Sequence, residues 1–203
     1  TGVAGAWLDS TPCLFISGQV KRADLIGDRG VRQMGFQEVD IVSLVHPITK
    51  YAVTITDPAS IRYHLEKAIY LAKSGRPGPA WIDIPLDVQA AVLDERLLDG
   101  FDPGYDVPEA GSEMLTSQVR RSIELLNQSE RPVILAGNGI RLSGAMGEFY
   151  ELIEMLDVPV LTTWKAIDFL GETHPLYAGR PGATGQRGAN FVQQNSDWLL
   201  IIG

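Results

Sequence analysis

Residues 57–85 contain the pattern that most limits how this chain can fold. An Asp-Pro pair at 57–58 opens a helix with a cap residue and a proline in its first turn. Apolar residues then recur at helical spacing, at Ile61, Leu65, Ala68, Ile69 and Ala72. Gly75 can take the positive φ that ends a helix, and the apolar run Ala80–Ile84 is stopped by Pro85. A helix that leads through a tight turn into a buried strand is half of a βαβ unit, which predicts a parallel sheet.

The rest of the chain repeats this alternation of short apolar runs and amphipathic stretches. We expect strands at 13–17, 50–56, 80–84, 133–136, 158–163 and 198–202. We expect helices at 2–10, 40–44, 57–75, 113–127, 144–156, 166–170 and 187–195, with a Gly-rich loop at 178–188. The sequence therefore predicts an α/β fold made of two parallel-sheet, three-layer units, with helices on both faces of each sheet.

Residues 94–112 differ in composition from the stretches on either side. Acidic residues, glycines and prolines cluster there without a sustained apolar period, which is typical of an interdomain linker. We therefore expect one domain at 1–93, a linker at 94–112 and a second, Rossmann-like domain at 113–203. The chain opens within a predicted helix and without Met, which indicates a fragment of a longer protein with a truncated second domain.

The charge balance and the single cysteine narrow the classes of function. The chain has 17 Lys and Arg against 25 Asp and Glu, a formal net charge of −8. Nucleic-acid binding is not expected, because phosphate backbones need clustered cations. Cys13 lies in an apolar run and is interpreted as a buried structural thiol, which fits a reducing cytoplasm. We see no membrane-spanning stretch and no signal peptide, so we expect a cytoplasmic protein.

Several motifs occur in an order that resembles one enzyme family. In chain order they are Ser17-Gly-Gln-Val20, Phe36-Gln-Glu38, Gly75-Arg-Pro-Gly-Pro79, Ile82-Asp-Ile-Pro85 and Arg131-Pro-Val-Ile-Leu-Ala-Gly-Asn-Gly139. Together they resemble the thiamine-diphosphate-dependent enzymes of the acetolactate synthase large-subunit group. The resemblance implies that residues 1–93 are the C-terminal part of a pyrimidine-binding domain, and that residues 113–203 are most of a central domain.

The resemblance also implies a function for the complete protein. It would be a thiamine-diphosphate- and Mg²⁺-dependent enzyme that decarboxylates a 2-oxo acid and then transfers or protonates the product. Such enzymes are homodimers or homotetramers whose active sites span two subunits. Their catalytic Glu would precede Thr1, and their Gly-Asp-Gly diphosphate motif does not occur here, so we expect this segment to be inert alone. The three histidines are far apart in the sequence, and we expect no metal ligands among them.

Gln37 is the candidate for the catalytic region. The matching Gln of the family lies close to the cofactor, and an amide offers both a donor and an acceptor to a keto acid or an aminopyrimidine ring. The alternative is a loop Gln that only satisfies backbone groups. Glu38 is expected to make a structural contact rather than to act as an acid or base.

Arg76 and two glycine-rich segments are the candidates for binding a nucleotide. Arg76 matches the position of an FAD-contacting Arg in acetolactate synthases. The turn Gly137-Asn138-Gly139 follows a strand and precedes a helix, so its backbone can approach a phosphate, with a tight βα connection as the alternative. In the loop at 178–188, which contains Gly182, Arg180 and Arg187 can bind a phosphate or carboxylate, or an Arg packs across a domain interface.

Two departures from the family pattern leave open the type of enzyme and the ligand of its central domain. Leu86 stands where acetolactate synthases usually carry a Lys, which leaves neighbouring 2-oxo-acid lyases open. Residues 162–168 differ from the family's segment at the flavin, so the central domain would hold FAD, ADP or nothing. The alternative from another class is a non-catalytic module that binds ADP or FAD.

Because the first half of the pyrimidine-binding domain would be missing, we also expect the strand at 13–17 to lack a neighbour.

Overall fold

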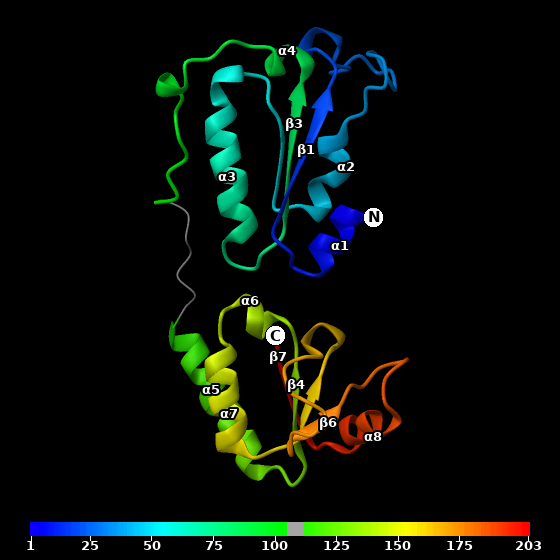
Figure 1. The fold of residues 1–203 in the computed structure, drawn as a ribbon, viewed down its shortest axis with the longest axis vertical. Coiled ribbons are helices and arrows are strands. Elements are labelled where there is room, and N and C mark those ends of the chain that lie inside the picture. The colour runs from blue at the N-terminus through cyan, green and yellow to red at the C-terminus, as the bar shows by residue number, and fades with distance from the viewer. Residues whose placement is uncertain (105–111) are drawn as a thin grey trace. The chain divides into compact units, whose positions relative to one another are not determined.

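The computed structural model of the chain describes residues 1–104 and 112–203. The chain divides into two compact units, Thr1–Pro108 and Glu109–Gly203 (Figure 1). Every strand pairing among the described residues is parallel, and helices cover the sheets, so the predicted α/β fold class is confirmed. Of the predicted linker at 94–112, residues 105–111 lie outside the described residues.

The first unit is built around a three-stranded sheet in the order β1-β3-β2. Its strands are β1 (Cys13–Gln19), β2 (Tyr51–Thr54) and β3 (Pro79–Pro85). Its helices are α1 (Gly2–Leu8), α2 (Ile41–Val45), α3 (Ile61–Lys73) and α4 (Leu86–Gln89), with 3₁₀ turns at Arg22–Asp24, His46–Ile48, Pro58–Ser60 and Glu95–Leu97. Within the described chain β1 pairs only with β3 and is therefore an edge strand of this sheet, and the expected missing neighbour stays a prediction.

Alternation along β3 sends its side chains to two different faces of the sheet. Ala80 and Ile82 are fully buried and pack in one cluster with small residues of α3. Trp81 and Asp83 therefore point to the opposite face, where α1 and α2 lie (Figure 1). There Trp81 stacks on Phe15 of β1 with ring centroids 5.2 Å apart. The first sheet thus has one apolar face and one face that mixes aromatic and polar side chains.

The predicted cap and turn signals are present in the first unit. The Asp40 carboxylate accepts the backbone N–H of Ser43 at 3.0 Å and caps α2. The Asp57 carboxylate accepts the N–H of Ala59 at 3.0 Å in the turn that leads into α3. Gly75 follows α3 with φ +54°, the left-handed conformation that its position in the sequence predicts. These local contacts fix where α3 ends and β3 begins.

Phe101, near the start of the predicted linker, is attached to α3. Its ring lies edge-on to Tyr63 at 5.6 Å and packs on Tyr70 at 5.5 Å. Its backbone N–H also donates to the Glu66 carboxylate at 2.7 Å. The described part of the linker therefore runs along the first unit as far as this residue.

The second unit contains a four-stranded sheet in the order β6-β5-β4-β7. Its strands are β4 (Pro132–Ala136), β5 (Val160–Thr162), β6 (Tyr177–Gly179) and β7 (Trp198–Ile202). Its helices are α5 (Ser112–Gln128), α6 (Gly139–Leu142), α7 (Met146–Leu156) and α8 (Arg187–Asn195), with a 3₁₀ turn at Trp164–Ala166. Among the described helices of both units, none has the length and apolarity that crossing a membrane requires.

The two faces of the second sheet carry separate apolar clusters. Ile134 and Val160 are fully buried on the face that packs against α7 and the 3₁₀ turn. Val133 and Leu161, which alternate with them, pack instead with Ala189 of α8. Helices therefore cover both faces of this sheet, as Figure 1 shows.

Three details of the second unit differ from the sequence-based expectation. The predicted loop at 178–188 begins within β6, which is missed because three residues are too short to show a period. The helix expected at 144–156 starts at Met146, because Gly144 takes φ +77° and separates α7 from α6. The helix expected at 166–170 is a 3₁₀ turn at Trp164–Ala166.

Candidate functional site

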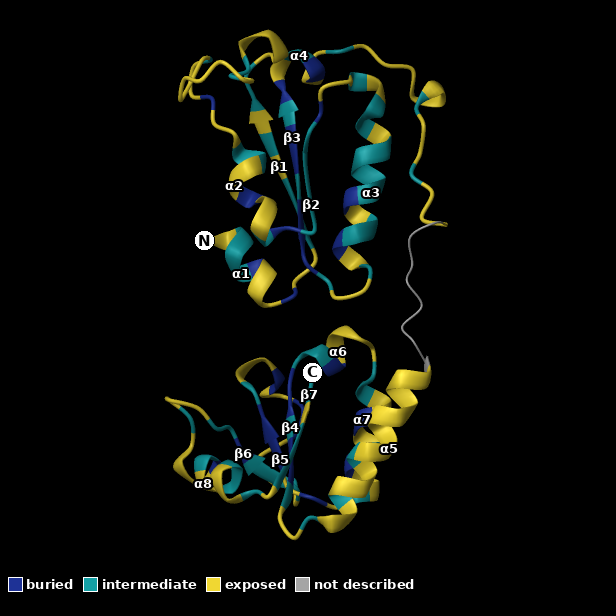
Figure 2. Ribbon diagram, turned by 180° about the vertical axis from the view of Figure 1, so that it is seen from behind, coloured by how far each residue is buried: buried dark blue, intermediate teal, exposed yellow. Residues whose placement is uncertain are grey.

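The segment at residues 20–40 lies at the carboxyl end of the first sheet. It leaves β1 after Gln19 and enters α2 at Ile41. Because the three strands are parallel, the end of β2 and the start of α4 lie at this same edge (Figure 2). Most of the segment is exposed, as the yellow ribbon in Figure 2 shows. Binding sites of parallel α/β sheets are usually built from such segments.

Gln37 is exposed in this segment and has a left-handed backbone, with φ +59°. For a residue other than glycine this conformation costs roughly 1–2 kcal/mol, so surrounding contacts must hold it. The neighbouring Phe36 side chain is 87% exposed. An amide and an aromatic ring are thus presented together to the outside of the unit.

Glu38 stabilises the left-handed conformation of Gln37 by binding the part of the loop that precedes it. Its buried carboxylate accepts the N–H groups of Met34 at 2.9 Å, Gly35 at 3.0 Å and Ile26. Burial raises the pKa of Glu38, but the hydrogen bonds from Gly35, Ile26 and Met34 outweigh it and hold the pKa below its ordinary value. The predicted structural contact of Glu38 is confirmed. This carboxylate closes the loop around Gln37.

Arg22 ties the beginning of the same segment to two other elements. Its Nε donates to the Asp87 carboxylate of α4 at 2.7 Å, and its backbone N–H donates to the same carboxylate at 3.0 Å. The guanidinium also donates to the carbonyl of Thr56, just after β2, at 2.8 Å. The hydrogen bond from the Arg22 side chain is the main reason that the pKa of Asp87 is lowered. Leu86, which precedes Asp87, is 54% exposed at this edge.

Arg76 lies at the other end of the first sheet. The turn that carries it precedes β3, whereas Gln37 follows β1. The seven residues of β3 span about 20 Å, so these two candidates do not form one site within the unit. The structure therefore separates a carboxyl-end site at Gln37 from an amino-end site at Arg76.

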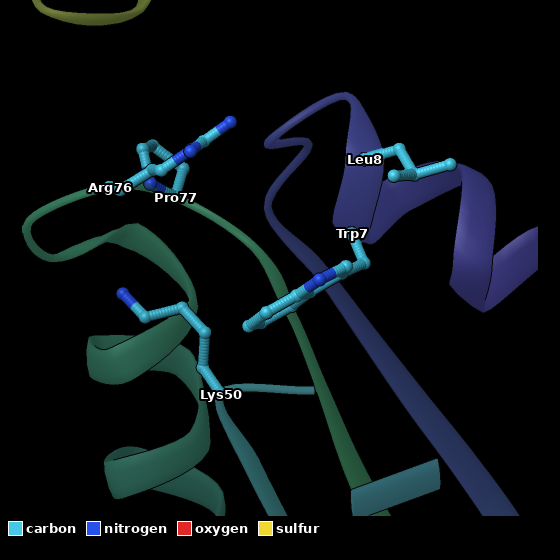
Figure 3. Close-up of a pocket in the computed structure, with 5 residues that line it drawn as sticks. All are labelled: Trp7, Leu8, Lys50, Arg76 and Pro77. Carbon is cyan, nitrogen blue, oxygen red and sulfur yellow. The ribbon is translucent and has the colours of Figure 1, made fainter. Parts of the chain in front are cut away.

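The amino-end site is a pocket of about 460 Å³. It is lined by Trp7, Leu8, Lys50, Arg76 and Pro77, as Figure 3 shows. Arg76 Nε donates to the Ser10 hydroxyl at 2.8 Å, and the Lys50 ammonium donates to the Ser74 carbonyl. Burial lowers the pKa of Lys50. Two cations beside an indole ring suit an anionic ligand that carries a flat ring.

In the second unit, the turn Gly137-Asn138-Gly139 lies at the carboxyl end of β4 and contacts the backbone of Gly203. The Gly137 N–H donates to the carbonyl of Ile202 at 2.7 Å. A Cβ on Gly139 would lie 2.4 Å from the carbonyl carbon of Gly203, and one on Gly137 would lie 3.2 Å from it. Close packing therefore accounts for both glycines, and the predicted phosphate contact stays a prediction.

A pocket of about 470 Å³ adjoins Gly139, between α6, α7 and the end of β7. The described residues that line it are apolar or small, apart from Ser143 and Glu148. The Asn138 side chain turns to Arg141, whose guanidinium donates to its amide oxygen at 3.4 Å. A carboxylate in an otherwise apolar lining favours an uncharged group over a phosphate.

Arg180 and Gly182 belong to a loop that closes on itself. The Arg180 guanidinium donates to the Tyr177 hydroxyl at 2.8 Å and lies 4.0 Å from the Glu172 carboxylate. Asn190 of α8 binds both the N–H of Gly182, at 2.8 Å, and its carbonyl, at 3.1 Å. The guanidinium thus has internal partners, and its predicted role in holding a ligand stays a prediction.

Two polar residues with a bearing on these sites were missed in the sequence. Thr162 is fully buried at the end of β5, beside Ala136 and the Gly137 turn, and its hydroxyl has no hydrogen-bond partner among the described residues. Thr162 follows two apolar residues, and nothing in that pattern indicated a buried polar residue without a partner. Asp83 is buried inside β3, and a carboxylate within the apolar run 80–84 was the sequence feature that could have indicated it.

In the part of the chain that the structure describes, no group of three or more His, Cys, Asp or Glu could hold a metal ion.

Comparison with known proteins gives a consistent result. Residues 119–203 match the family model described as "Thiamine pyrophosphate enzyme, central domain". The whole chain is 38% identical to the "Probable acetolactate synthase large subunit" of Methanocaldococcus jannaschii, of which it covers 34%. It is 36% identical to the "Acetolactate synthase large subunit" of Lactococcus lactis and to the "Glyoxylate carboligase" of Escherichia coli O157:H7, covering 34% and 33% of them.

The chain is a relative of the thiamine-diphosphate enzymes. The resemblance that its motifs predicted is confirmed, and residues 119–203 match the model of the central domain of these enzymes. The chain spans about a third of the length of the curated relatives it matches.

The carboxyl-end site offers part of what a thiamine-diphosphate enzyme needs at its cofactor. Gln37 supplies a neutral donor and acceptor, and the exposed Phe36 and Leu86 supply apolar surface. These groups fit the polar ring and substrate end of the cofactor. Arg22 at this edge is already paired with Asp87, and the Arg29 guanidinium donates to the Leu25 carbonyl at 2.6 Å, so both of these cations have partners within the unit.

Proposed function

We propose that the chain builds one wall of a thiamine-diphosphate site in a 2-oxo-acid decarboxylase or carboligase. Residues 1–93 would be the C-terminal part of the pyrimidine-binding domain, 94–112 the linker and 113–203 the central domain. The observation that carries the proposal is Gln37, an exposed amide in a strained left-handed conformation at the carboxyl end of a parallel sheet. The names of the relatives, acetolactate synthase and glyoxylate carboligase, support this class of reaction.

The residues of this wall would bind and orient rather than transfer protons. When bound, thiamine diphosphate supplies the electron sink for decarboxylation of a 2-oxo acid, and Mg²⁺ anchors its diphosphate. The Gln37 amide would orient the keto acid or the aminopyrimidine ring, while Phe36 and Leu86 would exclude water. Glu38 is engaged by three backbone N–H groups, which leaves it poorly placed to act as an acid or base. The wall alone would therefore be inert and would need a carboxylate and a diphosphate anchor from elsewhere.

We further propose that the complete protein binds a nucleotide, FAD or ADP, and that Arg76 and Lys50 contact it. The two cations around the Trp7 indole support an anionic ligand with a flat ring. The unpartnered hydroxyl of Thr162 supports a polar ligand in the second unit. A non-catalytic module would instead bind the nucleotide through Gly137, Gly139 and the loop at 178–188, but the enzyme names of the relatives favour a catalytic protein.

The proposed enzyme would work in the cytoplasm as a homodimer or homotetramer, on a small 2-oxo acid and without nucleic-acid or membrane partners. The edge of β1 that has no strand partner among the described residues supports association, because unpaired strand edges are usually covered.

The test is CO₂ release from glyoxylate and pyruvate by the intact protein, with and without thiamine diphosphate and Mg²⁺. We expect release that requires both, and titration calorimetry that detects FAD or ADP binding weakened by Arg76→Ala. Nucleotide binding with no effect of thiamine diphosphate on either substrate would favour the non-catalytic module and contradict the proposed enzyme.

A further inference from the structure

Three polar side chains form a row across the first sheet, on the face that α1 and α2 cover. In the strand register, Ser17 of β1 and Thr54 of β2 both pair with Asp83 of β3. Asp83 is 1% exposed, so its carboxylate lies in the interior of the unit. A carboxylate in such a place is costly unless donors surround it.

The donors on Asp83 come from both neighbouring strands. The Ser17 hydroxyl donates to Oδ1 at 2.6 Å, and the Thr54 hydroxyl donates to Oδ2 at 3.2 Å. The Trp81 indole N–H donates to the Ser17 oxygen at 2.9 Å, which directs the Ser17 proton toward Asp83. The third donor is Gln19, whose Nε2 lies 3.1 Å from Oδ2. All these donors are neutral.

Gln19 connects this buried carboxylate to the segment at 20–40. Its Nε2 carries two hydrogens: one goes to Asp83, and the other goes to the carbonyl of Val39 at 2.9 Å. Its amide oxygen accepts the N–H of Val20 at 3.0 Å. Because both acceptors face the nitrogen and a donor faces the oxygen, only one orientation of the amide satisfies every contact.

The contact with Val39 lies two residues from Gln37. The Val39 carbonyl also accepts the N–H of Ile41 at 2.9 Å, where α2 begins. Glu38 fastens the loop before Gln37, and Gln19 fastens the backbone after it. Gln37 is therefore held between two anchors, Glu38 and Gln19, and Gln19 is itself bound to Asp83.

We propose that Asp83 is a positioning residue that acts through Gln19 to hold Gln37 in its left-handed conformation at the carboxyl end of the sheet. The inference deepens the function proposed above and rests on it for the role of Gln37. An apolar residue would fill a buried strand position without the cost of burying a carboxylate. What the carboxylate adds is a second acceptor that fixes the Gln19 amide toward Val39.

The test compares Gln19→Met and Asp83→Val with the matched control Thr54→Val, in the intact protein. Thr54→Val removes a donor to the same carboxylate oxygen but leaves Gln19 in place. Hydrogen exchange followed by mass spectrometry reports on amides of residues 34–41 without any cofactor. We expect Gln19→Met and Asp83→Val to speed exchange there by about 10-fold, and Thr54→Val to leave it as in the unchanged protein.

A double variant separates positioning from general weakening of the sheet. If Asp83 acts through Gln19, adding Asp83→Val to Gln19→Met produces no further exchange at 34–41. In the enzyme assay, Gln19→Met should lower kcat by about 10-fold and change KM by less than about twofold, since the geometry rather than the binding surface is altered. Gln19 is only partly buried, so its variant remains informative even if Asp83→Val does not fold.

Unchanged exchange at 34–41 in Gln19→Met would overturn the inference, whatever the enzyme does. Equal acceleration in Thr54→Val would also overturn it, because that result assigns the effect to the sheet as a whole. Faster exchange in a protein without thiamine-dependent activity would support the link from Asp83 to Gln37 and contradict only the proposed function.

Discussion

Gly139 packs against Gly203 so closely that a Cβ at position 139 would lie 2.4 Å from the carbonyl carbon of Gly203. The contact joins the turn after β4 to the end of β7, two neighbouring strands of the second sheet. This close packing explains why the turn contains glycines without the involvement of a ligand. Backbone atoms cannot move aside as a flexible side chain can.

We predict that Gly139→Ala lowers the free energy of unfolding by about 1–3 kcal/mol, because the added methyl group forces the two backbones apart. The matched control is Gly147→Ala in α7, where a Cβ meets no atom within 4 Å. That change should stabilise the protein by about 0.5–1 kcal/mol, since alanine favours the helix. Denaturant unfolding measures both. The same sign for the two variants would contradict the close packing.

His64 gives a pH dependence to the stability of the first unit. Its Nδ1 lies 2.5 Å from the Tyr51 hydroxyl, and its pKa is lowered mainly by burial and then by the positive charge of Lys67. The unfolded chain takes up a proton near the ordinary value of 6.5, whereas the folded protein resists it. Stability is therefore retained above about pH 6.5 and lost as the pH falls below it.

The measurement for His64 is denaturant unfolding between pH 7.5 and pH 5. We expect His64→Gln to flatten the profile and Lys67→Met to flatten it only in part, because burial is the larger cause. A His64→Gln profile as steep as that of the unchanged protein would show that the loss arises elsewhere.

Asp197 lies between α8 and β7 and binds the connection between α5 and β4, at the amino end of the second sheet. Its carboxylate accepts the Ser129 hydroxyl and the N–H groups of Glu130 and Arg131, both at 2.9 Å. The Ser129 hydrogen bond, together with those from the backbone, lowers the pKa of Asp197 from 3.8 to about 2. A lowered carboxyl pKa contributes stability above pH 3.8 that is lost as the pH falls toward 2.

We predict that Asp197→Asn is less stable than the unchanged protein at neutral pH and loses less stability between pH 4 and pH 2. The matched variant Ser129→Ala removes one donor and should show a smaller change in the same direction. Acid titration followed by circular dichroism provides the comparison. Parallel acid profiles for all three proteins would be inconsistent with the anchoring role of Asp197.

The left-handed backbone of Gln37 predicts an unusual response to substitution. Gln37→Gly and Gln37→Ala both remove the amide, but only glycine adopts φ +59° without strain. We expect the glycine variant to be more stable than the alanine variant by about 1 kcal/mol, the reverse of the order at ordinary positions. Chemical denaturation gives the difference. A more stable alanine variant would mean that the loop relaxes out of this conformation.

Much of the fold could be predicted because local patterns determine it. The buried run at 80–84 and the helical stripe at 61–72 appear as β3 and α3, and the Asp40 cap begins α2 where expected. The errors came from short elements. β6 has three residues, and Gly144 interrupts a helix whose apolar pattern reads as continuous.

The candidate site could be predicted only in part. The motif at 36–38 indicated Gln37 and a structural role for Glu38, because these residues are adjacent in the sequence. The Asp83 network could not be predicted, since its partners on β1 and β2 are 29 to 66 residues away and meet only through strand register. The hydrogen bond between Arg76 and Ser10 has the same origin, since 66 residues separate its partners.

The measurement that tests the central claim most directly compares kcat/KM for thiamine-diphosphate-dependent decarboxylation in Gln37→Ala and Gln33→Ala variants of the intact protein. Both glutamines are exposed in the same loop, and Gln37 alone has the left-handed backbone between the two anchors. We predict that Gln37→Ala lowers kcat/KM at least 10-fold, about 1.4 kcal/mol in transition-state stabilisation, and that Gln33→Ala stays near the unchanged value. Equal activity of the two variants would contradict the placement of Gln37 at the cofactor.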